Sequence, residues 1–111
     1  MNEFKFDYEI FKGDDFKFNF CAKYKNGEKF KFVTGDVLVI IIKHRFFESV
    51  KVCEEFNITG DTYGKEILIS SDEMSKCDSG AHTLQIKLKR GELIKTLLDL
   101  NINIKPSEVI K

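Results

Sequence analysis

The sequence predicts an all-β domain: an antiparallel β-sandwich of about eight short strands with one short helical turn near residues 71–77. Three observations support this prediction. Apolar and polar residues alternate with period two through most of the chain, as in strands that have one face on a core and one face in water. Aromatic residues, which favour strands, are frequent, with 11 phenylalanines among 111 residues. Turn residues separate the alternating runs at intervals of roughly ten residues.

The N-terminal half begins with three alternating runs. Their apolar positions are Phe4, Phe6, Tyr8 and Ile10, then Phe16, Phe18 and Phe20, then Phe30 and Phe32. A two-residue Asn-Gly turn between the last two runs would put their phenylalanines on opposite faces. A three-residue loop, Lys25 to Gly27, instead pairs Phe20 with Phe32 and keeps one apolar face. Such loops place their glycine in the left-handed region, so we expect a positive φ at Gly27.

The apolar run at residues 37–42 does not alternate. It fits a central strand buried on both faces, or a strand with one face on the core and the other under a partner. In the next run every second residue is apolar, except that Glu54 occupies one of these positions. The apolar members are Val50, Val52, Phe56 and Ile58. We expect Glu54 to lie at a bulge or a sheet edge, where an inward charge blocks further sheet extension.

A helical turn is predicted after the strand that contains Ile67 and Ile69. Ser70 and Glu73 have the spacing of a capping box, so one or two helical turns should begin there. Met74 and Cys77 would then point inward.

Residues 92–100 fit two structures. As a helix, they would align Leu93, Ile94, Leu97 and Leu98. As a strand, they would continue one parity through Ile94, Leu98, Leu100, Ile102 and Ile104. The longer run favours the strand.

The length fits one domain, which we place at residues 1–105, followed by a loose tail at 106–111. Lys plus Arg and Asp plus Glu both number 18, so the formal net charge is zero. This balance argues against nucleic acid or an anionic membrane as the partner, because both attract a basic excess. No signal peptide is recognisable, and the longest apolar run is far shorter than the roughly 20 residues that span a bilayer.

The residues best suited to chemistry are three cysteines, Cys21, Cys53 and Cys77, and two histidines, His44 and His82. They lack the Cys-x-x-Cys and His-x-x-x-His spacings of common zinc sites. They could still converge into a metal site, or into a cysteine nucleophile with a histidine base. The simpler interpretation is three half-buried thiols in a reduced protein. We therefore expect no catalytic residues, no metal and no other cofactor.

Adjacent aromatic residues mark the candidate contact site, Arg45, Phe46 and Phe47. Neighbouring side chains of a strand face opposite ways, so at least one phenylalanine should lie in a loop or be exposed. An exposed aromatic beside an arginine is a common anchor of protein interfaces. Interleaved Lys and Phe could also form a platform for single-stranded nucleic acid, but the zero net charge favours phenylalanines that fill a core.

The order of the motifs is informative in itself. Residues 8–16 hold a strand, a Gly-Asp turn and a second strand, and the pattern continues through Asn26-Gly27 and residues 35–43. From Ser71 to Ile104 it runs through a short helical link at 71–75, Ser79-Gly80, the strand 84–88, Gly91-Glu92 and a final strand. This order resembles the immunoglobulin-like N-terminal module of phage baseplate upper proteins and related small phage structural proteins. Residues 81–83 depart from it, since the family often has a tyrosine pair there.

The resemblance implies an immunoglobulin-like fold and a non-enzymatic role. It suggests an adaptor in a phage tail or baseplate, or in a prophage or tail-derived particle, that acts through protein–protein contacts. Self-association into a homo-oligomer is a further expectation. The location implied is the virion or tail-like particle, after synthesis in the cytoplasm of the bacterial host. The alternative is a ligand-binding sandwich, such as a carbohydrate-binding module, although the chain has no tryptophan and three tyrosines.

Overall fold

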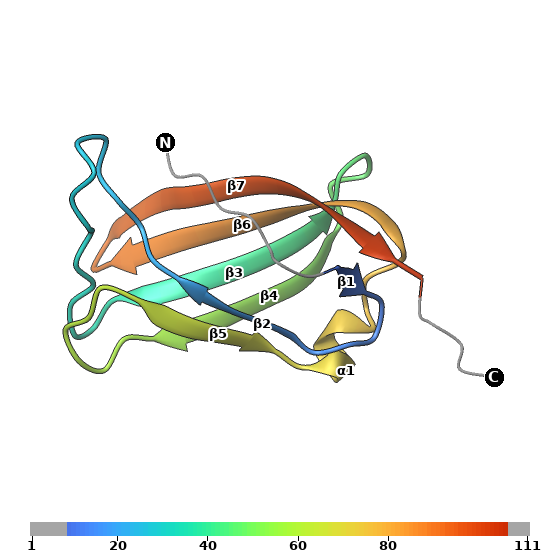
Figure 1. Ribbon diagram of the computed structural model, residues 1–111, viewed down its shortest axis with the longest axis horizontal. Coiled ribbons are helices and arrows are strands. Elements are labelled where there is room, and N and C mark those ends of the chain that lie inside the picture. Colours follow the sequence, from blue (N-terminus) through green and yellow to red (C-terminus); the bar gives the residue numbers. More distant parts are fainter. Residues whose placement is uncertain (1–8, 107–111) are drawn as a thin grey trace.

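Two β-sheets enclose one hydrophobic core in the computed structural model, which describes residues 9–106 (Figure 1). The described elements are β1 (Ile10–Phe11), β2 (Phe16–Phe20), β3 (Val37–His44), β4 (Val50–Asn57), β5 (Lys65–Ile69), α1 (Ser71–Met74), β6 (Gly80–Arg90) and β7 (Leu93–Lys105). The larger sheet has the order β1-β7-β6-β3-β4, and the smaller sheet pairs β2 with β5. The all-β prediction is confirmed. The prediction of purely antiparallel pairing was wrong, because β1 runs parallel to β7.

Strand β2 and the loop after it follow the predicted parity. Phe16, Phe18 and Phe20 are buried, and the residues between them are exposed. The three-residue loop is confirmed by a bridge between Lys23 and Lys29 and by a φ of 90° at Gly27. The predicted third strand, around Phe30 and Phe32, does not form. This part of the described chain makes isolated bridges from Lys29 to Lys23 and from Phe32 to Thr62, and the ladder partner of β2 is β5.

Strand β3 lies in the middle of the larger sheet, between β4 and β6. Leu38, Ile40 and Ile42 are fully buried on the core face. On the opposite face Val39 is 9% exposed, because Lys89 of β6 and Glu55 of β4 reach across β3 and approach to 3.7 Å. The face of β3 away from the core is only partly covered, since Val37 and Ile41 on that face are half-buried.

Glu54 lies on β4, an edge strand of the larger sheet, as predicted. It stands opposite Ile40, which belongs to the core, so its side chain points inward. Burial raises the pKa of the Glu54 carboxyl, and the charge of Glu73 adds to this effect while Lys76 opposes it. An inward carboxylate on an edge strand discourages another strand from pairing there.

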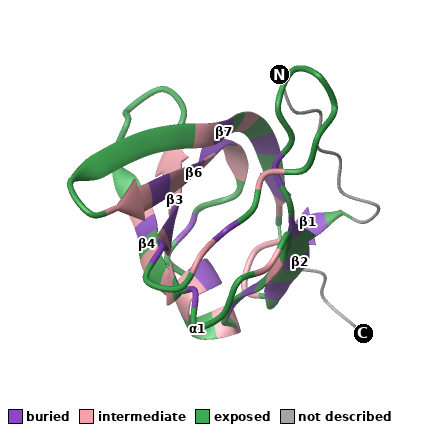
Figure 2. Cartoon of the chain, turned by 90° about the vertical axis from the view of Figure 1, so that its left-hand side faces the viewer, coloured by how far each residue is buried: buried purple, intermediate pink, exposed green. Residues whose placement is uncertain are grey.

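Two irregularities in strand pairing overturn parts of the parity prediction. The register shifts between Ile86 and Lys87, so Leu97 becomes an extra residue of β7. Such a bulge exchanges the two faces, which leaves Leu98 buried but makes Ile94 61% exposed. A shift at the end of β3 likewise leaves Val50 59% exposed. Figure 2 shows the resulting change along β7, whose first part is exposed. Residues 93–100 are strand, as favoured.

The predicted helical turn is present as α1. The side chain of Ser70 accepts a hydrogen bond from the Glu73 amide, and Met74 and Cys77 are fully buried. Asp15 also accepts from the Ser71 amide at 2.6 Å, which ties the turn to the start of β2. The predicted N-terminal positions Phe4, Phe6 and Tyr8 and most of the tail, residues 107–111, lie outside the described residues.

We predict that Glu54→Gln raises the free energy of unfolding at pH 7. Because the pKa of Glu54 is raised, the folded state favours the protonated carboxyl over the carboxylate. The stability that the protonated form contributes is present at low pH and is lost as the pH rises through the folded-state pKa. The gain should be no more than about 1 kcal/mol, because the side chain is only partly buried. Urea unfolding followed by circular dichroism measures it, and Glu92→Gln in the exposed β6–β7 turn is the control.

The difference in free energy of unfolding between Glu54→Gln and the wild type should disappear at acidic pH, where Glu54 is protonated. A variant less stable than the wild type at pH 7 would show instead that the Glu54 charge stabilises the fold.

Candidate functional site

The residues considered for metal binding or catalysis do not gather into a single cluster. Within residues 9–106 no three His, Cys, Asp or Glu side chains are grouped to hold a metal ion. All three cysteines are free; Cys21 and Cys53 are exposed and Cys77 is buried, so the prediction of half-buried thiols was wrong. Burial raises the pKa of the Cys77 thiol, which makes the reactive thiolate scarcer.

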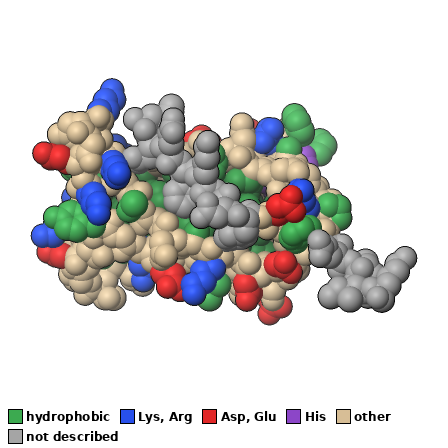
Figure 3. Space-filling view, viewed as in Figure 1, with side chains coloured by type: hydrophobic (Ala, Val, Ile, Leu, Met, Phe, Trp, Pro, Cys, Tyr) green, Lys and Arg blue, Asp and Glu red, His purple; other side chains and the backbone are tan. Residues whose placement is uncertain are grey.

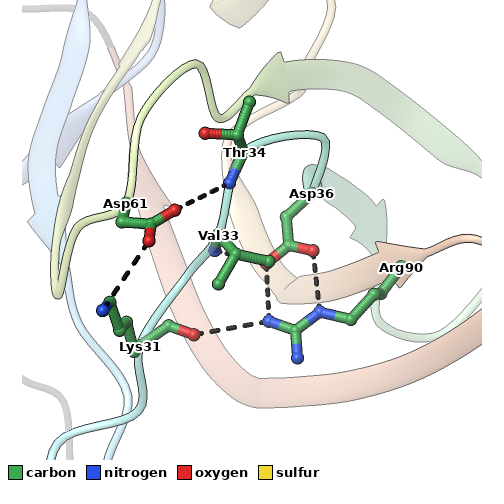
Figure 4. Close-up of polar contacts among 6 residues, drawn as sticks. All are labelled: Lys31, Val33, Thr34, Asp36, Asp61 and Arg90. Carbon is green, nitrogen blue, oxygen red and sulfur yellow. Dashed lines mark hydrogen bonds and ion pairs between the residues drawn. The ribbon is translucent and has the colours of Figure 1, made fainter.

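One conspicuous polar cluster surrounds Asp36, whose exposed fraction is 1% (Figure 4). Arg90 binds both carboxylate oxygens, with Nε 2.8 Å from Oδ1 and Nη2 2.7 Å from Oδ2. The Val33 amide donates to Oδ2 at 2.9 Å. Hydrogen bonds from Arg90 hold the pKa of Asp36 below its ordinary value, against the opposing effect of burial.

The other polar groups of this cluster also have hydrogen-bond partners within the chain. Arg90 also donates to the Lys31 carbonyl at 3.3 Å, and its guanidinium lies 5.3 Å from the centre of the Phe30 ring. Beside it, Asp61 accepts from the Thr34 amide at 3.2 Å. Because both oxygens of Asp36 already have partners in the fold, we interpret this cluster as structural.

The predicted contact residues Arg45, Phe46 and Phe47 lie together in the turn between β3 and β4, which we call the aromatic tip (residues 45–48). Phe46 is 75% exposed and Phe47 is 80% exposed. Both phenylalanines are thus outside the core. In Figure 3, hydrophobic side chains project beside a histidine at the end of the molecule where this turn lies in Figure 1.

Main-chain hydrogen bonds fix the shape of the aromatic tip. His44 donates its amide to the Ser49 carbonyl at 2.9 Å, and Glu48 donates to the His44 carbonyl at 2.8 Å. Glu48 takes a φ of 52°, which closes the turn in the left-handed region. The Arg45 amide donates to the Ala81 carbonyl at 3.2 Å, so the turn is also joined to the start of β6.

The imidazole of His44 organises the two phenylalanines. Its Nδ1 accepts the amide of Phe46 at 3.2 Å and that of Phe47 at 3.3 Å. The ring centres of His44 and Phe47 are 4.7 Å apart, and those of His44 and Phe46 are 6.1 Å apart. The side chain that begins the turn therefore sets the direction of both aromatic residues.

His82 lies directly across the sheet from His44, with the ring centres 5.4 Å apart and the rings nearly perpendicular. It is fully buried, its Nδ1 is 3.1 Å from the Gly80 carbonyl, and its Nε2 has no hydrogen-bond partner among the described residues. Sequence reasoning missed this pair. The available indication was that each histidine continues the apolar parity of its strand, two residues from Ile42 and Leu84.

A second surface feature lies at the other end of the larger sheet. Tyr24, Lys25, Asn26 and Glu28 line an open depression in the loop after β2. Tyr24 is 53% exposed, and its ring centre lies 5.5 Å from that of Phe30. An exposed aromatic face beside amide and carboxylate groups could receive a polar ligand.

Comparisons with protein-family models, with curated proteins and with solved structures found no match to this chain. Within the part of the chain described, no helix is long and apolar enough to cross a membrane.

We predict that Asp36→Asn lowers the free energy of unfolding by about 1–3 kcal/mol at pH 7, because it weakens two charge-assisted hydrogen bonds. Asp61→Asn is the matched control, since its pair with Lys31 is exposed and should change stability by about 0.5 kcal/mol or less.

The pH dependence identifies the interaction. Because the pKa of Asp36 is depressed in the folded state, its contribution is complete above the unfolded value of 3.8 and is lost as the pH falls through the folded-state pKa. The difference between wild type and Asp36→Asn should therefore shrink in strong acid. An equal difference at pH 7 and pH 2 would contradict the assignment.

Proposed function

We propose that this chain is a non-enzymatic structural protein, an adaptor in a phage tail, baseplate or tail-derived particle that acts through protein–protein contacts. The observation that carries the contact proposal is the aromatic tip, with Phe46 and Phe47 exposed on a turn fixed by hydrogen bonds. The phage setting rests on the resemblance in motif order. The motifs that carry it most clearly lie in α1, β6 and β7. An immunoglobulin-like arrangement of the sheets is part of this proposal.

The energetics favour a contact at the tip. Burying a phenylalanine side chain contributes about 1.5–3 kcal/mol, so Phe46 and Phe47 together could supply much of an interface. A turn already held in one conformation loses less entropy on binding than a loose loop. Arg45 adds a charged, planar group beside the rings, and aromatic and arginine side chains are enriched among the residues that dominate interfaces.

The test is mass spectrometry of tail particles purified from a host that produces this chain. We predict that the wild type is present at a constant ratio to the other particle proteins. The double substitution Phe46→Ser and Phe47→Ser should reduce its incorporation at least about tenfold, since one lost anchor costs roughly 2 kcal/mol or more.

Leu68→Ser is the matched control, because Leu68 is an apolar residue exposed on β5 and is not part of the tip. Circular dichroism of both variants confirms that they fold. Absence of the wild-type chain from particles and from their assembly intermediates would contradict the proposal, as would equal incorporation of the tip variant.

A second candidate function, a carbohydrate-binding module, is favoured by the depression beside Tyr24. Sugar rings stack on exposed aromatic faces. The Asn26 amide could donate hydrogen bonds to sugar hydroxyl groups, and the Glu28 carboxylate could accept them. A glycan array separates the two functions. Binding that Tyr24→Ala abolishes would support the module, and an array without hits would remove it.

A further inference from the structure

The hydrogen bonds of His44 define the protonation state in which the aromatic tip is held. Its Nδ1 accepts two backbone amides, so that nitrogen carries no proton and the ring is neutral with its proton on Nε2. A protonated imidazole has a donor on both nitrogens. Nδ1–H would then face the two donors of Phe46 and Phe47, and neither bond could form.

His82 has the complementary arrangement. Its Nδ1 faces the Gly80 carbonyl, which can only accept, so Nδ1 carries the proton and Nε2 is a bare acceptor. That nitrogen is buried and lacks a partner among the described residues. A proton on Nε2 would place a charge in the core, beside the ring of His44.

The surroundings do little to compensate a positive charge on either ring. On β3 and its turn, the nearest charged neighbours in sequence are Lys43, Arg45 and Glu48, of which two are cationic. Across the sheet, His82 faces Ile102 of β7, which is apolar. Within residues 9–106 no carboxylate forms an ion pair with either imidazole. Protonation therefore removes the acceptor function of His44, and no ion pair already present among the described residues offsets that loss.

We propose that the aromatic tip is acid-sensitive: protonation of His44 removes the acceptor that holds the Phe46 and Phe47 amides, and the turn opens. Histidine is the side chain that ordinarily gains its charge between about pH 5 and pH 8, so this interval is the one to test. The proton comes from solvent, and no other reactant takes part. An effect of this opening on incorporation into particles rests on the proposed function. The opening itself is a property of the isolated chain.

Nuclear magnetic resonance of the ¹⁵N-labelled chain without a partner tests the proposal. Between pH 8 and pH 5, the Phe46 and Phe47 amide resonances should shift along one titration curve. Their protection from hydrogen exchange, corrected for intrinsic rates, should fall about 5- to 30-fold. The Ile40 amide, in the centre of β3, should keep its protection, which separates opening of the tip from global unfolding.

Two variants assign the effect to His44. The side-chain oxygen of His44→Asn can still accept the amide two residues on but does not titrate, so its tip should stay closed throughout this pH range. His82→Leu removes the buried ring and should keep the titration at Phe46 and Phe47. Resonances that do not move in the wild type, or a titration that persists in His44→Asn, would overturn the proposal.

The outcome is separable from the proposed function. If the tip titrates but the double serine variant is incorporated into particles like the wild type, acid sensitivity stands and the adaptor role of the tip fails. If incorporation depends on the phenylalanines but their amides do not titrate, the adaptor role stands and the acid-sensitive turn fails.

Discussion

The ion pair between Asp36 and Arg90 ties the loop that links β2 to β3 to the end of β6 in the larger sheet. Asp36 directly precedes the central strand β3, at the end of the loop that arrives from the smaller sheet. Its carboxylate binds Arg90 at the end of β6, and its backbone carbonyl accepts the amide of Ile58, just past β4. A buried carboxylate needs such partners, so Asp36 must lie within hydrogen-bonding distance of Arg90 and of the Val33 amide. This requirement sets the position of the first residues of β3.

The aromatic tip follows the other end of the same strand, β3. A strand anchored at Asp36 and paired on both sides has a fixed register, which brings His44 opposite His82 and starts the turn at a defined place. The imidazole then holds the amides of Phe46 and Phe47. One end of β3 thus lies beside the fully hydrogen-bonded Asp36 carboxylate. The other end lies beside two exposed phenylalanines and the buried Nε2 of His82, which has no partner among the residues that the structure describes.

Much of this fold is predictable from local pattern, because alternation reports directly which face of a strand is buried. Parity alone selected the three-residue loop at Gly27, and the inward Glu54 predicted a sheet edge. The failures have two causes. The extra residue at Leu97 reverses parity and exposes Ile94, although the sequence continues its pattern. The pairing of β3 with β6, which brings His44 opposite His82, joins distant segments; the parity of each strand indicates the face of its histidine but not its partner.

We propose the aromatic tip as the surface through which a protein neighbour holds this chain. Photo-crosslinking tests it most directly, with benzoylphenylalanine in place of Phe47 and, for comparison, in place of Leu68 on β5. We predict that irradiation of assembled particles joins the chain to one discrete particle protein from position 47, with little product from position 68. Crosslinks from position 68 with none from position 47 would contradict the account.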